Sequence, residues 1–551
     1  MAYTNHAKGQ EKTPKWAARG KLRLIHVYGG PSHTAQMILK GSWDKSPTGL
    51  LSALRYGPKL LEDLKLKQIN AVCLTWALGF SHDCNQPQWD IVRKLLSLLK
   101  KKKIKSIAQI SIAAYFKDDP LHPRSPMSTQ NDETGSNVCA TNSLASMDAI
   151  SSREQVAHDV RAAIEAGFNG LFFDCETCDP NEAVVYLKEL RALAHSIQHP
   201  KAEDLIIYTN TSYLSSLDKI VNFKFVGSGI KPGFSENEGF KTNLPDWKLL
   251  FEKGGRDKAF SCGMYQGGMN EKELLLASAE ILAAGGTCSD ARVPPSHSRF
   301  HAKHSDLYST GDPVDHIGIL VEDTATIGND IQPCAEFLRS LLQANIQFDL
   351  IPITHIHQFV LRKYKLLSAV HVQNMSVDLL DALTIFVREN GGVLLAALPT
   401  GISGDDKEEH ATHPLLEVAP IANDGSNRYL KTVGSGTVIV YKNNESNINN
   451  TPSTILADIQ RFSGASSIEV QAPDGVIALL WGKGTQRWVH MLNYRNQACS
   501  GTIILPGCGG RKLTVHSPDE RKPSIEVLET GNAQAKFLIT GVDNYAIVEV
   551  N

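Results

Sequence analysis

The chain has 551 residues, with 56 Lys or Arg against 58 Asp or Glu, so its formal net charge is −2. This balance gives no electrostatic reason to expect a nucleic-acid or membrane-surface partner, and no apolar run is long enough to span a bilayer. The length predicts several domains, and ten dispersed cysteines predict reduced thiols. The N-terminus lacks the apolar core of a signal peptide, so a cytoplasmic location is expected unless a secretory signal precedes this sequence.

Apolar strand candidates alternate with amphipathic helical stretches over residues 1–312. Eight strands, with a helix or a helix-sized connection between successive ones, predict a (β/α)8 barrel rather than an open sheet. The expected fold class is therefore α/β. The strand candidates are residues 22–28, 70–76, 106–112, 170–174, 205–209, 223–227, 258–264 and 286–289, and the clearest helices are 57–66, 89–101, 153–166, 181–198 and 271–284.

Two long connections, residues 29–56 and 117–152, follow the first and third strands. Because the C-terminal ends of parallel strands share one face of a barrel, both connections belong on the face where barrel enzymes place their active sites. Their Ser, Asn, Asp and Pro content predicts irregular loops that wall a substrate cleft.

Residues 313–400 predict an open, doubly wound α/β domain. Gly391-Gly392 is expected to end a helix before the last strand of this domain. The first strand is followed by Glu322 and Asp323, which would repel phosphate, so no nucleotide cofactor is expected. The expected strands are 317–321, 347–351, 366–372 and 392–396, with helices at 331–344 and 377–389.

Residues 401–551 are rich in Asn, Gly and Ser and contain short, regularly spaced apolar stretches. Short strands separated by turn residues predict a β-rich linker and a C-terminal β-sandwich. The stretches are 437–441, 476–481, 488–493, 501–505, 512–515, 524–529, 536–540 and 545–550.

The fourth barrel strand carries the strongest chemical signal. The stretch Gly170–Asp174 (GLFFD) leads directly into Asp174, and Glu176 follows two residues later. Chemistry in α/β folds is placed at this end of a parallel strand. A purely structural alternative is that Asp174 caps the next helix, but two acids at one strand end exceed what a cap requires. Cys175 and Cys178 form a CxxC pair without a second pair at zinc-finger spacing, so no metal is expected there.

The other strand ends supply aromatic rings, amides and charged groups. Rings that stack on C–H faces, beside groups that hydrogen-bond hydroxyls, suit a polyhydroxylated ring. The residues expected to bind substrate, together with Glu176, are His26, Tyr28, Trp76, Tyr115, Tyr208, Asn210, Tyr265, Gln266, Asp290 and Arg292.

Glycosidic bond hydrolysis needs two carboxylates, about 5–5.5 Å apart for retention of configuration and about 6.5–9.5 Å for inversion. Asp174 is one candidate, and the loop after strand 6 offers Glu236 and Glu238 as its partner. Asp290 is a third candidate, although pairing with Arg292 explains it equally well. Strand 7 ends in Tyr265-Gln266 and provides no carboxylate.

Residues 363–367 (KYKLL) and 389–396 (ENGGVLLA), with Leu379, Asp381 and Ala382 between them, resemble the glutaminase-like trimerisation domain of barrel β-galactosidases. The order of barrel, open α/β domain and small β-sandwich is similar to these multidomain glycoside hydrolases over nearly the full chain. The resemblance implies an oligosaccharide or glycoside substrate and self-association through the α/β domain.

The strand Gly170–Asp174 is similar to the fourth strand of barrel glycosidases with an aspartate nucleophile, including α-L-fucosidases and α-galactosidases. This resemblance implies a retaining reaction in which Asp174 is the nucleophile and Glu236 or Glu238 is the acid/base, with Glu176 in support. The chain departs from the β-galactosidase pattern at its catalytic glutamates, which favours an α-linkage or an unusual sugar.

Two alternatives remain open at this point. In the first, Asp174, Glu176, His26 and Asp290 bind a metal ion in a barrel hydrolase. In the second, the chain binds carbohydrate without cleaving it, and its acids only contact hydroxyl groups. The glycosidase prediction itself requires neither a metal nor a cofactor.

Overall fold

A computed structural model shows the chain as two compact units, which are Met1–Ser228 with Gly254–Tyr265 and Gly285–Ser309, and Gly229–Lys253 with Gln266–Ala284 and Thr310–Asn551. The structure describes residues 13–26, 57–77, 82–112, 114–116, 142–144, 150–174, 180–197, 205–210, 223–228, 231–235, 239–254, 260–264, 269–290, 292–322, 332–353, 356, 361–372, 374–397, 401–402, 428–441, 452–463, 468–529, 531 and 533–551.

The first unit is built on an eight-stranded sheet in which every adjacent pair is parallel and the strands follow chain order. The Thr287 hydroxyl on the last strand donates to the Leu22 carbonyl at 3.0 Å, so this strand lies beside the segment leading into the first. That is the order and closure of a (β/α)8 barrel. The strands are β1 (Leu24–His26), β2 (Ala71–Ala77), β3 (Lys105–Ser111), β6 (Gly170–Asp174), β7 (Ile206–Thr209), β8 (Phe223–Ser228), β11 (Phe260–Met264) and β12 (Thr287–Cys288).

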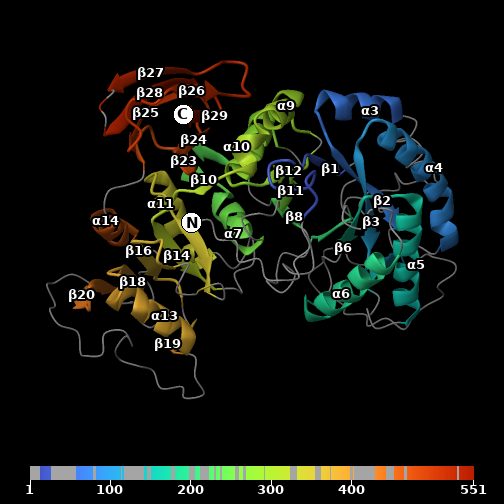
Figure 1. Cartoon of the computed structure of the whole chain (residues 1–551), viewed down its shortest axis with the longest axis horizontal. Helices are drawn as coiled ribbons and strands as arrows, with labels where there is room; N and C mark the ends of the chain where they lie inside the picture. The colour runs from blue at the N-terminus through green and yellow to red at the C-terminus, as the bar shows by residue number, and fades with distance from the viewer. Residues whose placement is uncertain are drawn as a thin grey trace. The chain divides into compact units, whose positions relative to one another are not determined.

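The two faces of this sheet bury different side chains. Val72, Leu74 and Trp76 join a core with the helices that cover the outer face, seen in blue to green in Figure 1. Ala71 and Cys73 instead join the core inside the sheet. Because side chains alternate along a strand, both faces of β2 are apolar. The helices are α3 (Gly57–Leu66), α4 (His82–Lys101), α5 (Ile150–Ala166) and α6 (Pro180–Ser196).

Shorter elements complete the first unit. They are the paired strands β4 (Ala114–Phe116) and β5 (Asn142–Leu144), and the helices α9 (Pro295–Lys303) and α10 (Ser305–Ser309). Among the helices that the structure describes in either unit, none is both long and apolar enough to cross a membrane.

The second unit contains a six-stranded sheet in the order β15-β14-β16-β18-β21-β20. All adjacent pairs are parallel except β21 with β20, which confirms an open α/β domain. The elements are β14 (Ile317–Val321), α11 (Gln332–Gln343), β15 (Asp349–Pro352), β16 (Leu366–Ala369), β17 (Asn374–Met375), α13 (Val377–Arg388), β18 (Val393–Ala397), β19 (Gly401–Ile402), β20 (Arg428–Val433), β21 (Gly436–Tyr441) and α14 (Pro452–Phe462).

Strand β21 differs from the sequence-based prediction. Residues 437–441 were expected among the sandwich strands, but they pair in parallel with β18 and extend the α/β sheet. Val438, Ile439 and Val440 are all buried, as a strand covered on both faces requires. The predicted domain boundaries at residues 312/313 and 400/401 remain predictions.

Gly391 and Gly392 connect α13 to β18, as the sequence predicted. Gly391 has a φ of +68°, a conformation that favours glycine at the end of a helix. At Gly392 an added Cβ would lie 2.1 Å from the Phe386 ring, so only glycine allows this close approach.

The C-terminal residues form two antiparallel sheets, ordered β13-β23-β24-β29-β26 and β22-β25-β28-β27, with one apolar core. This is the predicted β-sandwich. The expected fold class, a barrel followed by an open α/β domain and a β-sandwich, is therefore confirmed. The strands are β13 (Asp312–Pro313), β22 (Glu469–Gln471), β23 (Val476–Lys483), β24 (Gln486–Asn493), β25 (Cys499–Pro506), β26 (Leu513–His516), β27 (Ser524–Glu529), β28 (Gln534–Val542) and β29 (Tyr545–Val550).

The second unit also includes the hairpin β9 (Gly233–Ser235) and β10 (Gly239–Lys241), and the helices α7 (Leu244–Gly254) and α8 (Glu271–Ala283). The buried Glu280 of α8 accepts hydrogen bonds from the Tyr494 hydroxyl at 2.7 Å, from the Asn243 side chain at 3.2 Å and from the Thr242 hydroxyl. Burial raises the pKa of Glu280 to about 7, although these hydrogen bonds oppose the shift.

This pKa makes the stability of the second unit depend on pH. Folding raises the pKa of Glu280 above its ordinary value of 4.5, so the stability that the group contributes is lost as the pH rises from 4.5 to about 7. Tyr494→Phe removes a donor to the ionised carboxylate. We expect the free energy of unfolding of this variant to fall by about 1.5–3 kcal/mol at pH 8 and by about half of that at pH 5, measured by calorimetry.

Tyr545→Phe is the matched control. The Tyr545 hydroxyl lies 2.7 Å from the ring nitrogen Nδ1 of His490, whose pKa burial lowers to about 3. Because this imidazole stays neutral from pH 5 to 8, the control should lose the same stability at both pH values. An equal loss at both values for Tyr494→Phe would show that Glu280 does not ionise in the folded protein.

Candidate functional site

Asp174 ends the central strand β6 of the barrel. Every residue of this strand is buried, and Asp174 itself is 4% exposed. The strand packs closely against β7, because a Cβ at Gly170 would lie 2.5 Å from the Cγ1 atom of Ile206. The sequence therefore places a carboxylate at a strand end whose backbone is fixed on both sides.

Two side-chain amides hold the carboxylate of Asp174. Gln109 of β3 donates from Nε2 to Oδ2 at 3.0 Å, and Asn210, which follows β7, donates from Nδ2 to Oδ1 at 2.8 Å. Each carboxylate oxygen thus accepts a hydrogen bond from a neutral donor. The arrangement suits an ionised carboxylate, which only accepts hydrogen bonds.

The side chains of His26, Phe172 and Tyr208 pack together, with Phe172 and Tyr208 in the core inside the sheet. The Tyr208 hydroxyl is 3.2 Å from Nε2 of His26, and the rings of Tyr208 and Phe172 stack with centroids 4.6 Å apart. Burial lowers the pKa of His26 to about 3, so its imidazole is neutral at physiological pH. Burial also raises the pKa of the Cys73 thiol to about 12, which excludes a thiolate nucleophile at that position.

The structure therefore joins two pairs of the residues predicted from sequence, Asp174 with Asn210 and His26 with Tyr208. Asp290 and Arg292 form an ion pair with each other, with Oδ2 and the guanidinium nitrogen NH2 2.7 Å apart. The Tyr115 side chain lies outside the described residues, as do Tyr28, Glu176, Glu236, Glu238, Tyr265 and Gln266.

Trp76 does not lie on the inner face of the sheet, where it was expected to bind substrate. Its ring stacks on Trp89 of α4 with centroids 4.6 Å apart, and its Nε1 donates to the Asp159 carbonyl of α5 at 3.1 Å. Trp76 is therefore fully buried in the core between sheet and helices, on the face opposite Thr75. It does not contact the inner face, where a substrate would bind.

Gln109 and Thr75 were not among the site residues predicted from sequence. Both are buried on the inner face, and the Thr75 hydroxyl donates to Oε1 of Gln109 at 3.4 Å. The available signal was a polar residue inside an apolar strand, since Ile107 and Gln109 share one face of the segment SIAQIS. The prediction considered only the last residues of each strand and so passed over it.

In the described part of the chain, no group of three or more His, Cys, Asp or Glu side chains could hold a metal ion. Glu176, one of the four ligands in the metal-binding alternative, is not among the described residues.

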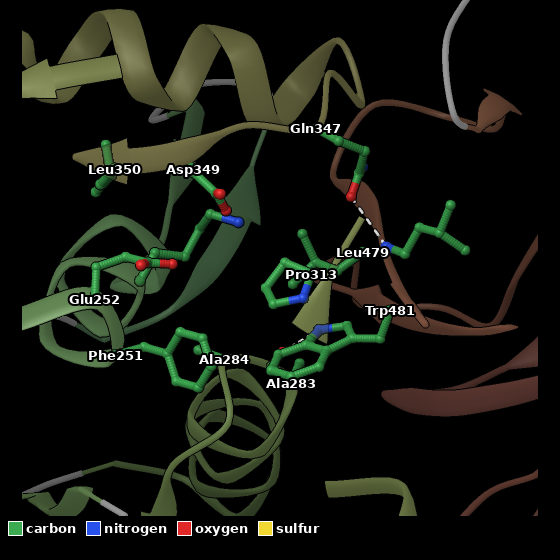
Figure 2. A pocket seen from close by; sticks show the side chains of 12 residues that line it. Phe251, Glu252, Ala283, Ala284, Pro313, Gln347, Asp349, Leu350, Leu479 and Trp481 are labelled. Atoms are coloured by element: carbon green, nitrogen blue, oxygen red, sulfur yellow. Dashed lines mark hydrogen bonds between the residues drawn. The ribbon is translucent and has the colours of Figure 1, made fainter. Parts of the chain in front are cut away.

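Figure 2 shows a pocket in the second unit, with about 340 Å³ of space that is partly open to solvent. Apolar side chains of α7 and β23 line it, and its polar groups are already engaged. Gln347 accepts from the Leu480 backbone at 3.0 Å, and Trp481 donates to the Ala283 carbonyl at 3.1 Å. None of its lining residues was predicted as a site residue.

No protein-family model matches the sequence, and no curated protein matches it. Solved structures do resemble it. An α-L-fucosidase, isoenzyme 2, from Paenibacillus thiaminolyticus is 12% identical with a TM-score of 0.63, over 96% of this chain and 99% of that one. A β-galactosidase from Rahnella sp. R3 is 12% identical with a TM-score of 0.62, over 98% and 99%. A β-galactosidase from Bacillus circulans sp. alkalophilus is 11% identical with a TM-score of 0.62, over 98% and 100%. The chain therefore has the fold of multidomain barrel glycoside hydrolases.

The packing of β6 against β7 can be tested with Gly170→Ala. The added Cβ would lie 2.5 Å from Ile206 Cγ1 and 3.0 Å from the Ile206 carbonyl oxygen, which pushes the two strands apart. We expect the variant to lose about 1–3 kcal/mol of stability, seen as a lower thermal unfolding midpoint. Gly233→Ala is the control, since nothing lies within 4 Å of its added Cβ. Equal midpoints for the two variants would contradict this packing.

Proposed function

We propose that the protein is a glycoside hydrolase that cleaves a glycosidic bond with retention of configuration, with Asp174 as its nucleophile. The observation that carries the proposal is the carboxylate of Asp174, buried at the C-terminal end of β6 and held by Gln109 and Asn210. Barrel enzymes place their chemistry at this end of the strands. The likeness in fold to an α-L-fucosidase and to β-galactosidases supports the same function.

In the proposed reaction, an Asp174 oxygen attacks the anomeric carbon and the leaving-group oxygen receives a proton. The covalent intermediate is then hydrolysed by a water molecule that gives its proton back to the same acid/base. The two amides restrict rotation of the carboxylate, so less rotational entropy is lost on reaching the transition state.

Glu236 and Glu238 are the proposed sources of the proton, and the choice between them stays open. They lie between β9 and β10, the strands of a described hairpin. The Phe234 amide of β9 donates to the Tyr494 carbonyl at 3.2 Å, and the rings of Phe240 and Tyr494 meet edge to face at 4.7 Å. Backbone and ring contacts with the sandwich therefore fix both strands that flank the proposed acid/base.

The substrate we propose is a glycoside or oligosaccharide, with an α-linkage or an unusual sugar. His26 would bind a sugar hydroxyl as a neutral hydrogen-bonding group, since burial keeps the imidazole uncharged. Tyr208 is fully buried and would hold that imidazole through its hydroxyl. Glu176 would add a further acceptor close to the nucleophile. Self-association through the α/β domain and a cytoplasmic location are part of the same proposal.

Asp174→Asn tests the proposed nucleophile. An amide in the same place cannot attack the anomeric carbon, so we expect kcat to fall by about 1000-fold or more. The assay is release of 4-nitrophenol from a panel of glycosides that includes the α-L-fucoside and the β-D-galactoside. Sodium azide added to Asp174→Gly should restore release and form a glycosyl azide of inverted anomeric configuration.

Asp159→Asn provides the matched control. Asp159 is also a buried aspartate of the first unit, but it lies on α5, where its Oδ1 accepts from Gln155 at 3.0 Å. This variant should keep the kcat of the wild type. Activity of Asp174→Asn within about tenfold of wild type, a change of only about 1.4 kcal/mol in the barrier, would rule out Asp174 as nucleophile.

A further inference from the structure

Three buried polar side chains form a chain of hydrogen bonds across neighbouring strands of the barrel. The Thr75 hydroxyl of β2 lies 3.4 Å from Oε1 of Gln109 on β3, and Nε2 of Gln109 lies 3.0 Å from Oδ2 of Asp174 on β6. All three are buried, and Gln109 is 1% exposed. They occupy the inner face, because each lies two residues after a residue of the core inside the sheet, namely Cys73, Ile107 and Phe172.

The orientation of the Gln109 amide follows from the chemistry of its two neighbours. An ionised carboxylate only accepts hydrogen bonds, so it requires the amide NH2 group. The amide oxygen then faces Thr75, whose hydroxyl donates to it. If the amide were reversed, its oxygen would face a carboxylate oxygen about 3 Å away, and two buried acceptors would repel each other.

From these hydrogen bonds we infer that Thr75 and Gln109 are positioning residues. They hold Asp174 ionised and in one orientation for attack. The inference rests on the proposed function, in which the nucleophile must be ionised. Thr75 acts only through Gln109, because its hydroxyl fixes which end of the amide faces the carboxylate. Asn210 supplies a donor to the other oxygen and completes the pair.

This assignment separates the roles of the two acids in the proposed reaction. A carboxylate that accepts from an amide on each oxygen is stabilised in its charged form. These donors oppose the effect of burial, which favours the neutral form, so the proposal assigns the leaving-group proton to another residue. The hydrogen bonds from Thr75 through Gln109 to Asp174 thus affect the charge state of the nucleophile as well as its position.

Gln109→Glu tests the charge state. The new carboxylate would face Asp174 at about 3 Å, and two acids at that distance share one proton. The acid limb of the pH profile of kcat/KM, measured with the best 4-nitrophenyl glycoside of the panel, should move up by about one pH unit or more. An unchanged acid limb would overturn the inference.

Thr75→Val tests the orientation of the amide. Valine keeps the shape and removes the hydroxyl, so we expect kcat to fall by about tenfold while KM stays within about twofold. Thr75→Ser should restore kcat. The control Thr287→Val removes another buried hydroxyl hydrogen bond of the barrel, to the Leu22 carbonyl, and should leave kcat unchanged. Equal kcat values for the two valine variants would overturn the role of Thr75.

The pH dependence of the stability of Gln109→Glu tests this inference without requiring any enzyme activity. It therefore separates the inference from the proposed function. The new carboxylate of Gln109→Glu and Asp174 repel when both are charged, so the variant should lose more stability as the pH rises from 5 to 8. The thermal unfolding midpoints of variant and wild type should therefore diverge over this range. The divergence should shrink in the double variant Gln109→Glu/Asp174→Asn, in which only the new carboxylate can ionise. If no glycoside is cleaved, this difference still supports the contact with an ionised Asp174, and a divergence of equal size in both variants overturns it.

Discussion

A carboxylate buried inside a barrel is stable only when protein donors replace the water that it loses, and Asp174 imposes this constraint on its neighbours. Strands β3 and β7 on either side each supply an amide, from Gln109 and Asn210. Glu280 of the second unit meets the same constraint with hydroxyl and amide donors, yet burial still raises its pKa to about 7. Glu280 joins the segment leading into α7, α8 and the sandwich, whereas Asp174 stands at the C-terminal end of a barrel strand, where barrel enzymes place their chemistry.

Most of the fold could be predicted from sequence because both faces of a barrel strand are buried. Such strands are continuous apolar runs, and Gly170–Asp174 is one of them. Glycine pairs mark the ends of helices, as Gly391 and Gly392 do after α13. The partner of a strand is harder to predict. Residues 437–441 have the length and composition of a sandwich strand, and only the pairing of β21 with β18 assigns them to the α/β sheet.

Part of the candidate site could be proposed from sequence, because Asp174, His26, Tyr208 and Asn210 all lie at or near strand ends. Gln109 was missed because it lies inside β3, and the hydrogen bond that gives it a role joins residues 65 positions apart. Trp76 was misassigned because a one-residue step along a strand moves a side chain to the other face. The pairing of β2 with β3 is also irregular between Thr75 and Ala77, which the sequence does not reveal.

The central claim is that Asp174 forms a covalent bond to the sugar, and trapping that intermediate tests it most directly. The wild-type protein would be incubated with the 2-deoxy-2-fluoro derivative of the glycoside that it cleaves, then digested and analysed by tandem mass spectrometry. The account predicts one added sugar on the peptide that contains Gly170–Asp174, attached to Asp174. A sugar attached to another residue would contradict it, as would a product of inverted anomeric configuration formed without any labelled peptide.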